Sequence, residues 1–128
     1  MRFNTWLAAA TCVAAMAPAA MAADYKVGAK AEGGTYLFRE PVEIYWNDWF
    51  GFPIMTDSAA ATRQTRVIVV GEGKTAGFVG QLSINCGNGK FYWEGATQFG
   101  TALPTERAIQ DLVPAQVVGN ARRLLCVR

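Results

Sequence analysis

Few side chains in this sequence have the types and spacing that chemistry requires. The chain contains no histidine, so histidine bases, serine–histidine pairs and histidine-based metal sites do not arise. Glu43 and Asp48 lie close together in sequence, and a pair of carboxylates can act as acid and base in glycoside hydrolysis. Ordinary solvated acids explain the same two residues more simply. We therefore interpret the chain as a protein that is not an enzyme.

A glycine-rich stretch, VIVVGEGKTAG at residues 67–77, contains two patterns found in nucleotide sites. The pattern GxGxxA follows a strand, as in dinucleotide-binding folds, and GKT resembles the end of a phosphate-binding loop. The phosphate loop needs a glycine where this chain has Ile68, and the dinucleotide site needs a helix where FVGQLSINC has the pattern of a strand. We interpret the stretch as a turn between two strands and expect no cofactor and no bound metal.

The first residues predict export. Residues 1–22 combine a positive charge at Arg2, an apolar alanine-rich run and the small-residue site Ala20-Met21-Ala22, as secretory signal peptides do. We expect cleavage after Ala22, with Ala23 as the alternative. The apolar run is shorter than the roughly 20 residues that span a bilayer, and Thr11 before Cys12 does not fit a lipid-attachment site. We expect a periplasmic or secreted bacterial protein with no lipid anchor and no stable membrane insertion after signal cleavage.

The mature chain, residues 23–128, has the size of a single domain. The sequence has 12 Lys+Arg and 10 Asp+Glu, and only Arg2 lies in the leader, so the net charge falls to about +1. This balance gives no electrostatic basis for binding nucleic acid. Two cysteines remain, Cys86 and Cys126, and an even pair in an exported protein predicts a disulfide.

A β-hairpin is predicted over QLSINCGNGKFYWEG, residues 81–95. Asn88-Gly89 suits a two-residue type I′ turn, because both residues tolerate positive φ. That turn pairs Cys86 with Phe91 and Ile84 with Trp93. One face of the hairpin is then apolar and the other is mostly polar. The apolar face consists of Leu82, Ile84, Cys86, Phe91 and Trp93.

Further strands are predicted from β-branched and aromatic runs. Residues 65–70, TRVIVV, have the pattern of a central strand, and residues 34–38 and 42–46 have the pattern of two more. The polar segment 56–64 is predicted to be a mobile loop. The expected class is α+β, with a small antiparallel sheet of five to six strands and a C-terminal helix packed across one face and held by one disulfide.

Two helical segments follow the strands. Residues 104–113 have apolar positions at helical spacing, and Pro114 ends or restarts the helix. After Pro114 the apolar residues fall within about 120° of arc, which predicts a helix that lies on the sheet. We expect this helix to finish at Leu125, which frees Cys126 to turn toward Cys86. The predicted apolar stripe consists of Val117, Val118, Ala121, Leu124 and Leu125.

Two surfaces are candidates for partner binding. The first is the aromatic stretch IYWNDWFGFP, residues 44–53, in which strand alternation assigns Trp46 to the core and Asn47-Asp48 to a turn. Trp49, Phe50 and Phe52 then fall in a loop, where they either cover one end of the sheet or form an exposed aromatic patch that contacts a ligand; we favour burial.

The second candidate surface is basic. Arg122 and Arg123, with Arg128 nearby, lie on or near the polar side of the last helix and could bind an anionic partner such as a sulfated glycan. A solvated helix face that complements the negative C-terminal end of the helix dipole explains them more simply, and we favour that interpretation.

The order of strand, Cys86, tight hairpin, strand and terminal helix resembles the surface-adhesin protein E family of small exported bacterial proteins. The resemblance rests on LSINCGNGKFYWEG (residues 82–95) and VPAQVVGNARRLLC (residues 113–126), roughly the C-terminal half of the mature chain. It implies an antiparallel sheet with a C-terminal helix held across it by the disulfide, and attachment to host matrix proteins such as vitronectin and laminin. The chain departs from that adhesin in lacking a lipobox.

The expected function is therefore that of a non-catalytic exported binding module, adhesin-like, whose partner is a protein or glycan of the envelope or host matrix. A periplasmic inhibitor of a cell-wall hydrolase is the alternative, because such inhibitors are also small, disulfide-bonded and rich in strands. A carboxylate-based glycan hydrolase, using Glu43 and Asp48, is a third hypothesis.

Overall fold

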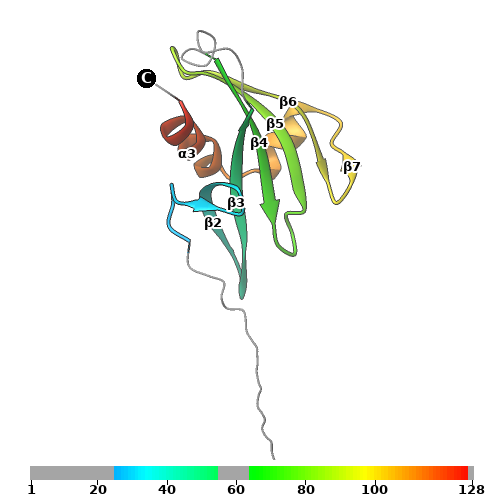
Figure 1. The fold of residues 1–128 in the computed structure, drawn as a ribbon. Helices are drawn as coiled ribbons and strands as arrows, with labels where there is room; N and C mark the ends of the chain where they lie inside the picture. Colours follow the sequence, from blue (N-terminus) through cyan, green and yellow to red (C-terminus); the bar gives the residue numbers. More distant parts are fainter. Residues whose placement is uncertain (1–24, 55–63, 127–128) are drawn as a thin grey trace, which may run out of the picture.

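The computed structural model describes residues 25–54 and 64–126, which form one sheet with two helices against one of its faces (Figure 1). The strands are β1 (Lys30–Ala31), β2 (Gly34–Val42), β3 (Tyr45–Ile54), β4 (Gln64–Glu72), β5 (Phe78–Asn85), β6 (Phe91–Gln98) and β7 (Thr101–Ala102), and the helices are α2 (Glu106–Leu112) and α3 (Ala115–Leu125). The predicted signal peptide, the loop at 56–63 and Arg128 fall outside the described residues.

The strands follow one another across the sheet in chain order, and each neighbouring pair is antiparallel. The predicted strands at 34–38 and 65–70 lie within β2 and β4, and β4 is the central strand. The predicted α+β class is confirmed. The sheet has seven strands rather than five or six, because β1 and β7 are two-residue pairings too short to produce a hydrophobic period.

The predicted strand at 42–46 is wrong, because the chain reverses there. Val42 pairs with Tyr45, and Glu43 and Ile44 form the turn between β2 and β3. Glu43 adopts the left-handed conformation, with φ of 53°. Glutamate and isoleucine are unusual in a tight hairpin turn, where Gly, Asn and Asp are favoured, so these residue types contain no turn signal.

Because of the misplaced turn, the predicted environment of Trp46 is wrong and Trp49 lies in a strand instead of a loop. Trp46, predicted in the core, has 48% of its surface exposed and lies under the Arg39 guanidinium, 4.4 Å from the ring centroid. Trp49 is fully buried. Asn47 and Asp48, predicted as a turn, lie inside β3. Trp49 and Phe50 are buried, so the hypothesis that the aromatic stretch forms core is confirmed for these two residues, but they are part of a strand rather than a loop.

The β5–β6 hairpin exists, with a longer turn than predicted. Ile84 pairs with Phe91 and Leu82 with Trp93, two residues away from the expected register. The Asn85 side chain causes the difference, because its Oδ1 accepts hydrogen bonds from the backbone N–H of Gly87 and Asn88 and so organises a wider turn. An even shift leaves each side chain on its predicted face. Leu82, Ile84 and Trp93 are buried accordingly.

Helix α2 lies within the predicted segment 104–113, and the second helix follows Pro114 as predicted. Thr105 caps α2, its hydroxyl accepting from the backbone N–H of Ala108, and Val113 is extended because it precedes Pro114. Pro114 then caps α3, which ends at Leu125 as expected. α3 packs over β2 and β3, whereas α2 packs over β6. The predicted stripe faces the sheet: Val117, Val118 and Ala121 are buried, and Leu124 and Leu125 pack against the same core.

The outer edge of β6 is joined to α2 by a side chain. Glu106, in the first turn of α2, accepts a hydrogen bond from the backbone N–H of Trp93 at 2.8 Å. A carboxylate is also favoured at this position because the N-terminal end of a helix carries partial positive charge. Glu106 therefore fixes the helix against the strand edge.

The predicted disulfide between Cys86 and Cys126 is confirmed, with a Cα–Cα distance of 5.5 Å. It joins the end of the β5–β6 hairpin to the residue that follows α3. Neither described helix is both long and apolar enough to cross a membrane. The disulfide is compatible with a periplasmic or extracellular location.

A second apolar cluster lies on the sheet face away from the helices. Tyr36 and Phe50 pack edge to face, with their ring centroids 5.4 Å apart, and Tyr25 and Phe52 pack around them. The Tyr36 hydroxyl donates to Asp48 at 2.5 Å, and the same carboxylate accepts from Arg39 Nε at 2.9 Å. Burial raises the pKa of Tyr36 above its ordinary value of about 10, and the hydrogen bond to Asp48 raises it further.

This raised pKa predicts a loss of stability in alkali. The unfolded chain releases the Tyr36 proton near pH 10 and the folded chain releases it later, so the stabilisation is complete below pH 10 and is lost as pH rises above it. Urea midpoints measured from pH 8 to pH 11 should fall less steeply for Tyr36→Phe than for the wild type. Tyr25, whose pKa is raised chiefly by its hydrogen bond to Glu32, leaves a residual slope of the same sign. Equal slopes in the two proteins would contradict the assignment to Tyr36.

Candidate functional site

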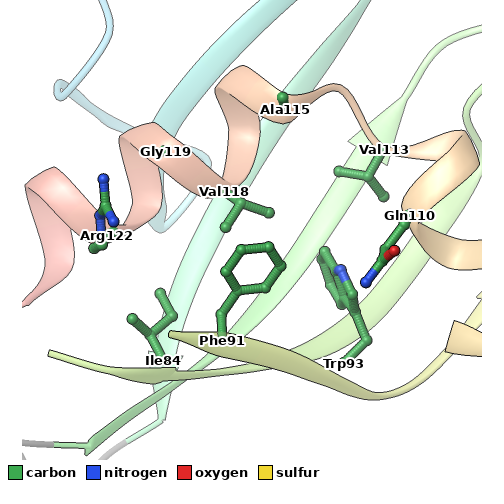
Figure 2. Close-up of a pocket in the computed structure, with 9 residues that line it drawn as sticks. All are labelled: Ile84, Phe91, Trp93, Gln110, Val113, Ala115, Val118, Gly119 and Arg122. Carbon is green, nitrogen blue, oxygen red and sulfur yellow. The ribbon is translucent and has the colours of Figure 1, made fainter. Parts of the chain in front are cut away.

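A groove lies between the β5–β6 hairpin and the two helices, with a volume of about 420 Å³. Its existence follows from where the helices pack: α3 covers β2 and β3, α2 covers β6, and the end of the hairpin between them is left partly uncovered. In Figure 2, side chains rise from the hairpin toward the helices, and Val113 and Val118 point back toward them. The lining residues are Ile84, Phe91, Trp93, Gln110, Val113, Ala115, Val118, Gly119 and Arg122.

The exposed ring of Phe91 indicates that protein side chains do not fill the groove. It belongs to the face of the hairpin that packs against the helices, with Leu82 and Ile84, yet 42% of its surface is exposed. Trp93, next on the same face, is only 5% exposed. An aromatic ring on the core side of a sheet normally ends up buried. Val118 of α3 points toward the Phe91 ring (Figure 2), but the helix covers it only in part, so the ring stays open to the groove.

Gly119 contributes to the open space of the groove on the α3 side. It lies in the middle of the helix and lines the groove, and a Cβ built on it would have no atom within 4 Å. Close packing therefore does not require a glycine there. A glycine inside a helix costs roughly 0.5–1 kcal/mol relative to alanine, and no contact in the described structure offsets this cost. The glycine leaves the space at this part of the groove wall open.

Arg122 lies at one end of the groove, and Gln110 lies at the other (Figure 2). Arg122 reaches from α3 to the turn of the hairpin, where Gly89 makes room for it. Gly89 has a φ of 79°, and a Cβ on it would lie only 2.8 Å from Arg122 Nη1. The turn thus requires a glycine for two reasons, its left-handed backbone and the arginine above it.

A second hollow adjoins the groove and shares Arg122 with it. It has a volume of about 300 Å³ and is lined by Cys86, Gly89, Arg122, Arg123 and Cys126. Arg123 donates a hydrogen bond to Asn120 Oδ1 at 3.1 Å. Within the described part of the chain, neither arginine forms an ion pair, and neither hollow is lined by an acid. The apolar groove therefore leads into a cationic hollow.

Arg122 and Arg123, predicted as partner-binding residues, thus lie at this site. Trp49, Phe50 and Phe52, the other candidates, do not: Trp49 belongs to the main core, and Phe50 and Phe52 belong to the cluster on the opposite sheet face. Sequence reasoning placed Phe91, Trp93 and Val118 on inward faces but did not identify the groove. Gly119, a glycine in the middle of a strongly amphipathic helix, was the signal that could have indicated it.

The remaining motifs have structural roles. The Glu43–Asp48 pair is not assembled as a dyad, since Glu43 lies in the β2–β3 turn and Asp48 bonds to Tyr36 and Arg39. The glycine-rich stretch is the turn between β4 and β5, as predicted. Across residues 25–54 and 64–126, no three His, Cys, Asp or Glu side chains are grouped to hold a metal ion.

Comparisons of the chain with family models, with curated proteins and with solved structures give no match. The function must therefore be argued from the groove. An apolar trough with aromatic and aliphatic walls can hold an apolar group, and its volume lies within the range of small-molecule sites, about 300–1,000 Å³. The two arginines supply charge at one end only.

Proposed function

We propose that this chain is an exported, non-catalytic binding protein and that the groove is its binding site. The observation that carries the proposal is the exposed ring of Phe91 on the sheet face that packs against the helices, in a groove that is also lined by Gly119, where the space for a side chain is open. The signal-peptide pattern and the disulfide support export. The partners implied by the surface-adhesin protein E resemblance, host-matrix proteins or envelope components, belong to this proposal if they present an apolar group to the groove.

A neutral fluorescent probe, N-phenyl-1-naphthylamine, tests the groove directly because it becomes bright in apolar sites and carries no charge. We expect the folded protein to bind it with micromolar affinity and Gly119→Leu to weaken binding at least tenfold, since the new side chain extends into the open space. Gln116→Leu is the matched control, because it adds the same side chain to an exposed position of α3 that does not line the groove.

Both leucine variants should remain folded, since leucine is a better helix former than glycine and at least as good as glutamine. Melting curves for all three proteins verify this point before binding is compared. Failure of the wild type to bind the probe, or equal binding by the two leucine variants, would remove the groove as the binding site.

A periplasmic inhibitor of a cell-wall hydrolase is the second candidate, and one feature favours it. The β2–β3 hairpin extends past the β4–β5 turn in Figure 1, and Ile44 at its tip is 93% exposed beside Glu43. A projecting tip with an apolar and an acidic side chain could enter the active-site cleft of another protein. Inhibition of lysozyme in a peptidoglycan turbidity assay, abolished by Ile44→Ser and unaffected by Gly119→Leu, would favour this candidate.

A further inference from the structure

We propose that the ligand of the groove is a small amphipathic anion, with one apolar chain and a carboxylate or phosphate head that binds Arg122 and Arg123. This inference rests on the proposed function, because it assumes that the groove binds a ligand, and it adds the chemical class of that ligand. Charge complementarity carries it: the apolar groove and the cationic hollow share one residue, Arg122, so a single molecule can occupy both.

The lining and volume of the groove indicate that the body of the ligand is one apolar chain. Phe91, Val118 and Val113 form the middle of the groove and carry no hydrogen-bonding group, whereas the amide of Gln110 and the indole N–H of Trp93 lie toward the far end. Placing a polar group in the middle would leave it without a partner, at a cost of roughly 1–3 kcal/mol. At about 420 Å³ the groove lies near the lower end of the range for small-molecule sites, which favours one chain over two.

The two arginines indicate that the head group of the ligand is an anion. Two guanidinium groups without ion pairs in the described structure lie beside a hollow that no carboxylate lines. Arg122 is held in place by the hairpin turn, where it lies over Gly89, and Arg123 is oriented by Asn120. Guanidinium groups bind carboxylate and phosphate oxygens with paired, charge-assisted hydrogen bonds, so such a head fits this end of the site.

Displacement of N-phenyl-1-naphthylamine by three ligands of equal chain length tests the proposal: decanoate, decyl phosphate and uncharged decanol. We expect both anions to bind at least tenfold more tightly than decanol, the gain expected from charge-assisted hydrogen bonds in a partly enclosed site. The tighter of the two anions identifies the preferred head group.

In the double variant Arg122→Gln/Arg123→Gln the anions should lose this advantage while decanol binds as before. Arg107→Gln is the control, since Arg107 is an exposed arginine on α2 that pairs with Asp111 and does not line the groove. Trp93 on the groove wall gives a second readout, because a brominated decanoate should quench its fluorescence in the wild type and less in Gly119→Leu.

Equal affinity for decanoate and decanol would contradict the proposal that the ligand is an anion. Binding of the probe in the same experiment would still support the groove as a binding site. An anion preference that persists in the double arginine variant would also overturn the inference. Absence of probe binding to the folded wild type would instead contradict the proposed function itself. The two failures are therefore distinct.

Discussion

Replacement of Trp49 by alanine is expected to destabilise the fold by about 3–5 kcal/mol, the range for a buried aromatic truncated to alanine. Trp49 is fully buried in β3, packs against Phe78 with their ring centroids 5.4 Å apart, and donates its indole N–H to Glu40 at 3.1 Å. The variant loses packing and also leaves a carboxylate oxygen with one donor fewer. Urea denaturation monitored by circular dichroism measures the change, and at this magnitude a large part of the total stability is lost.

Trp46→Ala is the matched control in the same strand. Trp46 is half-exposed, and its main described contact is the stacked Arg39, which is worth about 0.5–1 kcal/mol at an exposed site. We therefore expect a change below about 1 kcal/mol for this variant. If Trp46→Ala proves the more damaging of the two, the β2–β3 turn is misplaced and the sequence-based assignment of Trp46 to the core was right.

Loss of the disulfide is expected to cost about 4 kcal/mol, because the bond closes a loop with a sequence separation of 40 residues and so restricts the unfolded chain. Cys86→Ala/Cys126→Ala should show this loss as a lower urea midpoint. Hydrogen exchange should lose protection in α3 first, while the β5–β6 hairpin keeps its own strand pairing.

Reductant provides the control for this experiment. It should lower the melting temperature of the wild type and leave the double variant unchanged, and without reductant the wild type should be lighter than its dithiol form by two hydrogen atoms. A melting temperature that does not respond to reductant in the wild type would contradict the stabilising role of Cys86–Cys126.

The elements that the sequence predicted well depend on local periodicity. The stripe of Val117, Val118 and Ala121 is a property of α3 alone, and Pro114 breaks the helix wherever it occurs. The two faces of the β5–β6 hairpin were predicted correctly although the register was wrong. The register error was two residues, and side chains alternate between the faces with a period of two. The disulfide followed from the cysteine count and the export signal.

The elements that the sequence did not predict depend on tertiary structure. The turn at Glu43-Ile44 carries no glycine, asparagine or aspartate, so it is imposed by the pairing of β2 with β3. Because the turn was missed, Trp46 was assigned to the core and Trp49 to a loop. The groove is harder still to predict. It depends on where α2 and α3 pack relative to the hairpin, and it brings together Phe91 and Gly119, which are distant in sequence.

The Glu106 carboxylate on the outer edge of β6 has a consequence for association between molecules. A free strand edge is a template on which a strand from another chain can add, and long apolar edges promote aggregation for that reason. An incoming strand would need the N–H of Trp93, which Glu106 already occupies. Growth of the sheet by strand addition is therefore blocked beside the groove, so the exposed Phe91 can stay open to ligands without the edge next to it recruiting a second copy of the chain.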